Sequence, residues 1–97
     1  MQSLASVYLT GELDLSNVSG LRAKLEAIDG PAVVDLSEVT YLDSTALNEL
    51  ALLRRRVGTV ALVVASANVR RTLEIVGFGQ SFRIVGKREE LGLRDPE

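Results

Sequence analysis

The residues of this chain that could carry chemistry are concentrated in one short polar cluster, Asp43-Ser44-Thr45. The cluster follows a hydrophobic segment and precedes a segment with the composition of a helix. Ser, Thr and Asp are preferred at the start of a helix, where a side-chain oxygen accepts hydrogen bonds from free backbone N–H groups. Either the cluster only caps this helix, or one of its hydroxyl groups has a chemical role as well. The two interpretations are compatible, because Asp43 can cap the helix while Ser44 faces outward.

Several classes of site are excluded by residues that the chain lacks, since it contains no histidine and no cysteine. A Ser-His-Asp triad, a Cys-His pair, a disulfide and a zinc site of the usual ligands are therefore impossible. No GxxxxGK[ST] phosphate-binding loop occurs, and the closely spaced Gly77 and Gly79 lack a third glycine and a preceding strand. We therefore expect a protein that is not an enzyme and that uses neither a metal ion nor a cofactor.

Length and composition are those of one folded domain spanning residues 1–97, with 46% hydrophobic and 25% charged residues. The net charge of −2 provides no basic field for nucleic acid. The longest apolar run, at 60–65, is too short to cross a bilayer, and the N-terminal residues lack the pattern of a signal peptide. The absence of cysteine fits a reducing compartment. We expect a cytoplasmic protein that binds no nucleic acid and does not insert into membranes.

Hydrophobic periodicity predicts strands and helices in alternation. Strands are expected at 7–10, 32–36, 60–65 and 82–85, and helices at 18–28, 46–57 and 68–76, with a last helical turn at 88–91. Residues 37–42 are expected to form a connecting loop. The order β-α-β-α-β-α-β predicts an α/β domain, with a small, mostly parallel or mixed sheet of four to five strands packed with three to four helices.

The apolar residues of each predicted helix share one face. The first helix is expected to be capped by Ser16 or Asn17 and to bury Val18, Leu21, Leu25 and Ile28. The second is expected to bury Ala46, Leu47, Leu50, Leu53 and Val57, and the third Val69, Leu73 and Val76. Three arginines, Arg54 to Arg56, occupy the last turn of the second helix, where cations suit the negative end of the helix dipole.

Functional sites in parallel sheets gather at the carboxyl ends of the strands. The Asp43 cluster lies at this end, and Asp14 is expected near it, either as a cap for the first helix or as part of the same site. The hypothesis of a small enzyme or a nucleotide-binding protein would rest only on the grouping of Asp14, Asp43 and Ser44, because the sequence contains no loop that could bind phosphate. Asp35 lies within a strand and faces either solvent or a groove.

Three segments occur in the order and at the intervals of a known family. They are GELD at 11–14, VDLS at 34–37 followed by LDSTAL at 42–47, and NVRRTLEIVGF at 68–78. Together they resemble the STAS domain of bacterial anti-sigma factor antagonists over almost the whole chain from Val7. The chain departs from the family at Ala46, where Gly is usual, and in the short segment before Val7, where family members commonly carry another strand. We expect Ala46 to make the helix start firmer, by about 1 kcal/mol, and to place a methyl group near an approaching kinase.

The resemblance implies a protein switch that performs no chemistry itself. Such antagonists bind an anti-sigma factor that is also a serine kinase, and thereby free a sigma factor. The kinase phosphorylates the serine directly after the aspartate, which here is Ser44, and a serine/threonine phosphatase reverses the modification. Thr45 ranks second as acceptor, because the helix turns it away by about 100°. The residues expected to contact partners are Asp14, Tyr41, Asp43, Ser44, Thr45 and Asn48.

A second hypothesis keeps this fold and omits the switch. Related stand-alone STAS domains are subunits of lipid-transport ABC complexes, where they bind the ATPase and stabilise it. Such subunits resemble this chain in length and in a slightly degraded motif, which Ala46 and the short segment before Val7 also indicate. Under either hypothesis the partner is a protein, and an uncovered edge at strand 7–10 would permit a monomer or a weak dimer.

Overall fold

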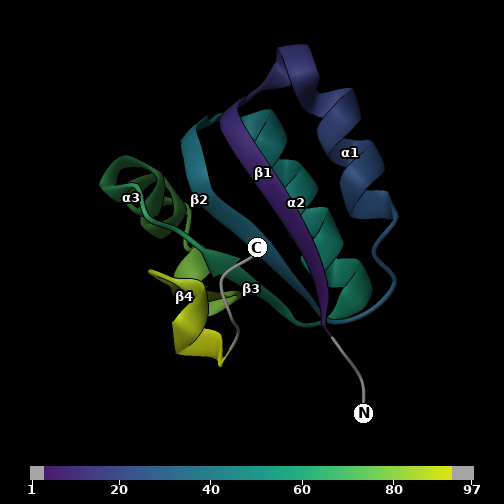
Figure 1. Cartoon of the computed structure of the whole chain (residues 1–97). Helices are drawn as coiled ribbons and strands as arrows, with labels where there is room; N and C mark the ends of the chain where they lie inside the picture. Colours follow the sequence, from purple (N-terminus) through teal and green to yellow (C-terminus); the bar gives the residue numbers. More distant parts are fainter. Residues whose placement is uncertain (1–3, 93–97) are drawn as a thin grey trace.

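A computed structural model describes residues 4–92 of the chain, which are built around a four-stranded parallel sheet (Figure 1). The strands are β1 (Ala5–Leu13), β2 (Ala32–Leu42), β3 (Val60–Val63) and β4 (Arg83–Val85). They lie in the order β1-β2-β3-β4, and each neighbouring pair is parallel. The predicted α/β class and element order are confirmed, with four strands in the part of the chain that the structure describes.

Three α-helices connect the strands: α1 (Val18–Glu26), α2 (Ser44–Val57) and α3 (Ala67–Ile75). Three short 3₁₀ segments accompany them, η1 (Leu15–Asn17), η2 (Phe78–Gln80) and η3 (Arg88–Leu91), and η3 confirms the predicted last helical turn. Because strand order follows chain order, right-handed crossovers place all three helices on one face of the sheet. Figure 1 shows α1 and α2 side by side along β1 and β2. None of the described helices is both long and apolar enough to cross a membrane.

One apolar core joins the helices to the sheet, and it contains most of the residues that periodicity had assigned to it. Its helical members are Leu21, Leu25, Ala46, Leu50, Leu53, Val69 and Leu73, with Leu47 and Val57 packed against it. The prediction that Val76 is buried is wrong. The helix α3 ends at Ile75, and Val76 is its C-cap residue and is 47% exposed. Glu49 is also buried in α2, where Arg22 of α1 lies 3.1 Å from its Oε2.

The second half of β2 occupies residues 37–42, so the prediction of a connecting loop there is wrong. This part pairs with β1 as far as Leu13 and Leu42. Two register shifts interrupt the pairing, the second of them at Gly11, which has φ +79° and lies within β1 instead of ending it. Such irregularities break the strict alternation of inward and outward residues, and this explains why the apolar pattern concealed a strand.

The face of the sheet away from the helices carries a smaller apolar cluster and a buried carboxylate. Val33, Ala61, Val63 and Val85 pack there with Leu91 of η3. Asp35 is only 1% exposed; its Oδ1 accepts hydrogen bonds from Ser37 N (2.9 Å) and Ser37 Oγ (2.6 Å). Arg88 of η3 lies 3.4 Å from the other carboxylate oxygen. Asp35 therefore faces a small groove of about 280 Å³, which Ser37 and Arg88 also line, and is itself almost fully buried.

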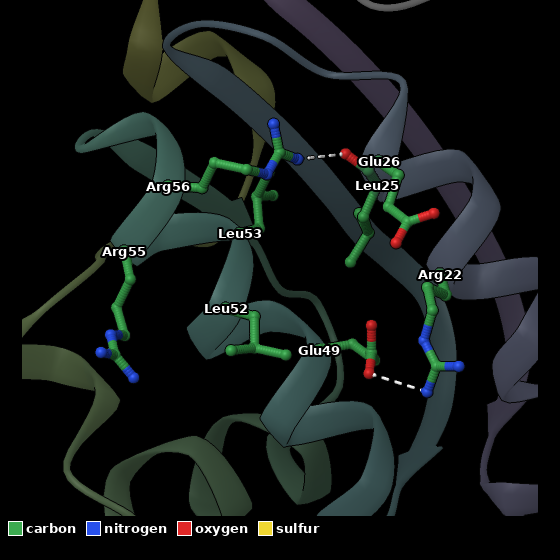
Figure 2. A pocket seen from close by; sticks show the side chains of 8 residues that line it. All are labelled: Arg22, Leu25, Glu26, Glu49, Leu52, Leu53, Arg55 and Arg56. Atoms are coloured by element: carbon green, nitrogen blue, oxygen red, sulfur yellow. Dashed lines mark hydrogen bonds and ion pairs between the residues drawn. The ribbon is translucent and has the colours of Figure 1, made fainter.

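Two of the three arginines at the end of α2 bind backbone carbonyl groups of other segments. Arg54 Nε donates to Ser81 O at 2.9 Å, and the two terminal nitrogens of Arg56 donate to Ile28 O (2.5 Å) and Leu25 O (2.8 Å). Figure 2 shows the Arg56 guanidinium reaching across to the end of α1. Besides the predicted interaction with the dipole of its own helix, Arg56 therefore also binds carbonyl groups at and just after the C-terminus of α1.

Replacing Arg56 tests this contact between the two helices. We expect Arg56→Ala to lower the free energy of unfolding by about 1–2 kcal/mol, because it removes two charge-assisted hydrogen bonds to carbonyls at a helix end. Arg55→Ala removes an exposed arginine from the same turn and should change stability by no more than about 0.5 kcal/mol. Urea denaturation followed by circular dichroism measures both variants, and equal losses would contradict the assigned role of Arg56.

Candidate functional site

The carboxyl ends of β1 and β2 lie side by side and bring two aspartates to the same edge. Leu13 and Leu42 are partners at the end of the strand pair, and Asp43 N donates to Leu13 O at 3.1 Å. Asp14 and Asp43 each follow directly on one of these leucines. The expectation that the polar cluster and Asp14 share one end of the sheet is therefore met in the structure.

Asp43 is the N-cap of α2, and its carboxylate joins two segments of the chain. One oxygen accepts a hydrogen bond from Ala46 N at 3.0 Å, and the other accepts one from Leu15 N at 2.9 Å. The predicted capping role of Asp43 is confirmed by the first of these contacts. The second contact, to a residue 28 positions earlier, attaches the start of α2 to η1.

Asp14 caps η1 by a similar local device. Its Oδ1 accepts a hydrogen bond from Ser16 N at 3.0 Å. Asp14 and Asn17 also form a capping box, in which Asn17 Oδ1 accepts a hydrogen bond from Asp14 N at 3.0 Å and the Asp14 side chain accepts one from the backbone of Asn17. Asn17 also donates from Nδ2 to Glu12 O at 2.7 Å. The capping interpretation of Asp14 is thus present in the structure, one element earlier than α1, and these contacts hold the loop after β1 in place.

Ser44 is the first residue of α2, and its side chain is exposed. Thr45 is half-buried, whereas Asn48, one helical turn after Ser44, is exposed. Tyr41 is exposed on β2, where it is the register partner of Glu12. The predicted residues therefore surround the ends of β1 and β2 and the first turn of α2.

Ala46 lies on the inner face of the first turn of α2 and is 0% exposed. Its methyl group therefore faces the apolar core and not the surface that carries Ser44. The expectation that this methyl group would stand near an approaching kinase is wrong, because residues two apart on a helix point in different directions. The departure from the family pattern at this position affects packing.

The cluster forms a surface and not an enclosed pocket. A groove of about 490 Å³ lies between α1 and α2, and it is lined by Arg22, Leu25, Glu26, Glu49, Leu52, Leu53, Arg55 and Arg56 (Figure 2). None of the predicted site residues lines this groove. Among the described residues, no group of three or more His, Cys, Asp or Glu side chains could hold a metal ion.

The described groups whose pKa departs from its ordinary value lie away from the cluster. The hydrogen bond that Tyr8 donates to Glu38 raises the pKa of the tyrosine hydroxyl. The hydrogen bond to Glu49, followed by the charge of that carboxylate, raises the pKa of Arg22. Both effects stabilise protonated groups outside the site and supply no acid or base to Ser44.

Leu15 is a member of this surface that the sequence analysis did not select. Its side chain is 71% exposed, and its backbone N–H donates to Asp43. A single exposed leucine leaves no signal in an apolar pattern, because isolated apolar residues on surfaces are common. The position directly after the GELD segment was the one feature of the sequence that connected Leu15 with the site.

Two solved structures of the anti-sigma factor antagonist SpoIIAA are similar in fold. The unphosphorylated form gives a TM-score of 0.66 at 20% identity, over 95% of this chain and 89% of that one. The phosphorylated form, described as a Bacillus cell fate determinant, gives 0.65 at 19% identity, over 95% of this chain and 93% of that one. At these identities the likeness concerns the fold.

A curated relative and a family model agree with this fold. A STAS-domain containing protein of Pseudomonas aeruginosa strain UCBPP-PA14 is 46% identical over 56 residues, which cover 54% of this chain. The match spans 55% of the length of that relative. The family model described as "Mlab, STAS domain" matches residues 3–86, and this range includes all four strands and all three α-helices. The chain therefore belongs to the STAS domain family.

Proposed function

We propose that this protein is an anti-sigma factor antagonist whose binding is controlled by phosphorylation at Ser44. In the unphosphorylated form it binds an anti-sigma factor that is also a serine kinase, and the bound sigma factor is released. The observation that carries the proposal is the exposed hydroxyl of Ser44, placed directly after a cap that two backbone hydrogen bonds hold in position. The protein is the substrate of the kinase and of a serine/threonine phosphatase, and it is not itself an enzyme.

A phosphate on Ser44 is compatible with the folded domain. It would add about −1.5 to −2 charges at the N-terminus of a 14-residue helix, where the dipole is positive and backbone N–H groups are free. The carboxylate of Asp43 opposes it from the preceding residue, but that carboxylate is already paired with two N–H groups. The inactivating effect is therefore expected at the binding surface, where a partner fitted to a neutral hydroxyl would have to desolvate a dianion.

The other predicted contact residues are assigned to the same binding surface. Tyr41 and Asn48 expose side chains next to the first turn of α2, and Asp14 and Thr45 are half-buried beside them. The partial burial of Thr45 supports Ser44 as the acceptor, since a kinase needs access to the hydroxyl oxygen. The protein is proposed to act in the cytoplasm as a monomer or a weak dimer, with β1 at one edge of the sheet.

A second candidate function is that of a stand-alone STAS subunit which binds and stabilises the ATPase of a lipid-transport ABC complex. Two observations favour it: the matching family model is described as Mlab, and Ala46 replaces the glycine usual in antagonists. The same surface would then bind an ATPase without a switch. An ATPase that co-purifies with the protein and is equally stable with the Ser44→Ala variant would support this candidate over the first.

Phosphorylation by the anti-sigma factor kinase of the source organism tests the proposal directly. With ATP we expect one phosphate on the wild type, mapped to Ser44 by mass spectrometry, and the same label on Thr45→Ala. Ser44→Ala should bind the kinase but remain unlabelled, whereas Ser44→Asp should bind at least about tenfold more weakly, since about 1.4 kcal/mol is lost. Ser19→Ala, which removes an exposed serine of α1, is the matched control and should behave as wild type. A label on any other residue would refute the assignment of Ser44.

Asp43 is expected to matter for stability as well as for the position of Ser44. Asp43→Ala removes both accepted hydrogen bonds and should lower the free energy of unfolding by about 1–2 kcal/mol. Asp43→Asn keeps one acceptor oxygen for the cap and should lose less, because Asn is also a good N-cap residue. Asp29→Ala, at an exposed position outside the helices, is the control. Urea denaturation measures the series, and an unchanged stability of Asp43→Ala would show that the carboxylate is not a structural link.

A further inference from the structure

Leu15 has a combination of properties that none of the predicted site residues has. Its side chain is 71% exposed, it belongs to none of the apolar clusters of the described residues, and it begins η1 at the carboxyl end of β1. An exposed leucine is not unusual by itself. The second observation is that the backbone of Leu15 is attached to the residue that precedes Ser44, through the bond to Asp43 Oδ2 at 2.9 Å.

This attachment fixes where Leu15 lies relative to Ser44. Asp43 is also bound to Leu13 O through its own N–H, at 3.1 Å, and the capping box of Asp14 holds the turn on the other side of Leu15. The loop is therefore ordered before any partner binds. An apolar side chain on an ordered backbone contributes more to binding than one on a mobile loop, because less conformational entropy is lost.

The charges around Leu15 indicate what kind of partner the surface fits. The carboxylates of Asp14, which caps η1, and of Asp43, which accepts a hydrogen bond from Leu15 N, border it. These charges disfavour an anionic bilayer, which attracts basic segments. They also disfavour a second copy of the same surface, since a two-fold interface would bring like charges together. They suit a protein that presents an apolar pocket bordered by lysine or arginine.

We propose that Leu15 is the apolar anchor by which the partner kinase holds this protein while Ser44 enters its active site. The proposal rests on the proposed function and adds a residue that determines binding without being modified. Leu15 inserts into an apolar pocket of the kinase, and the fixed position of the η1 backbone relative to the start of α2 sets the position of the Ser44 hydroxyl. The anchor acts on the affinity of the complex and not on the transfer of the phosphate.

The matched control for this anchor is Ile75, which is 74% exposed at the last position of α3. α3 follows β3 and carries none of the predicted site residues, so Ile75 belongs to a different element from Leu15 and Ser44. Ile75→Ala removes an apolar side chain of similar size and exposure from a surface outside the proposed interface. Leu15→Met keeps an apolar side chain of similar volume at the anchor position.

Steady-state phosphorylation of these variants by the purified anti-sigma factor kinase tests the proposal. We expect Leu15→Ala to raise KM about tenfold with kcat within about twofold of wild type, which marks a loss of binding common to substrate and transition state. Leu15→Met should remain within about threefold of wild-type KM, and Ile75→Ala should match wild type. All variants should have the same melting temperature as the wild type, because neither Leu15 nor Ile75 belongs to the core.

Each remaining result has a defined meaning. Equal KM values for Leu15→Ala and Ile75→Ala, with Ser44 labelled normally, would overturn the anchor and leave the proposed function intact. Absence of label on the wild type would overturn the proposed function and the anchor together. Sedimentation with vesicles of phosphatidylglycerol and phosphatidylethanolamine that depended on Leu15 would identify a lipid surface as the partner and refute the proposal.

Discussion

The carboxylate of Asp43 is the interaction on which the arrangement of this site depends. With one oxygen it caps α2, and with the other it holds the first residue of η1. Without it, the first turn of α2 and the loop after β1 would have no direct link through a side chain at this point. A helix start and a loop that are far apart in sequence thus become one surface. A carboxylate suits this task because each of its two oxygens can accept a hydrogen bond from a different backbone N–H group.

The position of Asp43 in turn depends on how β1 and β2 end together. Both strands extend beyond β3 and β4, and their pairing contains two register shifts before it reaches Leu13 and Leu42. A different register would move Asp43 away from Leu15 and turn inward residues outward. The left-handed conformation of Gly11 at the second shift is therefore part of what aligns the two strand ends. The pairing of β1 with β2 therefore determines the arrangement of the proposed binding surface more than any local motif does.

Local features of the chain were predictable from its sequence, and long-range contacts were not. Apolar spacing was sufficient to predict the helices, the strand order along the chain and most of the core, because each depends on residues within one element. The Asp43 cap was predictable for the same reason. The bond from Leu15 to Asp43 spans 28 residues and depends on a strand register that the pattern does not contain. The burial of Glu49 likewise required Arg22 on another helix.

The buried carboxylate of Asp35 has a consequence for how the chain folds during synthesis. Its cation, Arg88, lies 53 residues further along the chain and leaves the ribosome long after β2. Until then, burial of Asp35 on the sheet would leave a charge without its arginine, which is unfavourable. The core on the helix-covered face is complete once the chain has been made as far as Phe82, whereas the opposite face has to stay hydrated until Arg88 follows. The two faces of one sheet are therefore completed at different times, and closure of the second face waits for the last segment of the described chain.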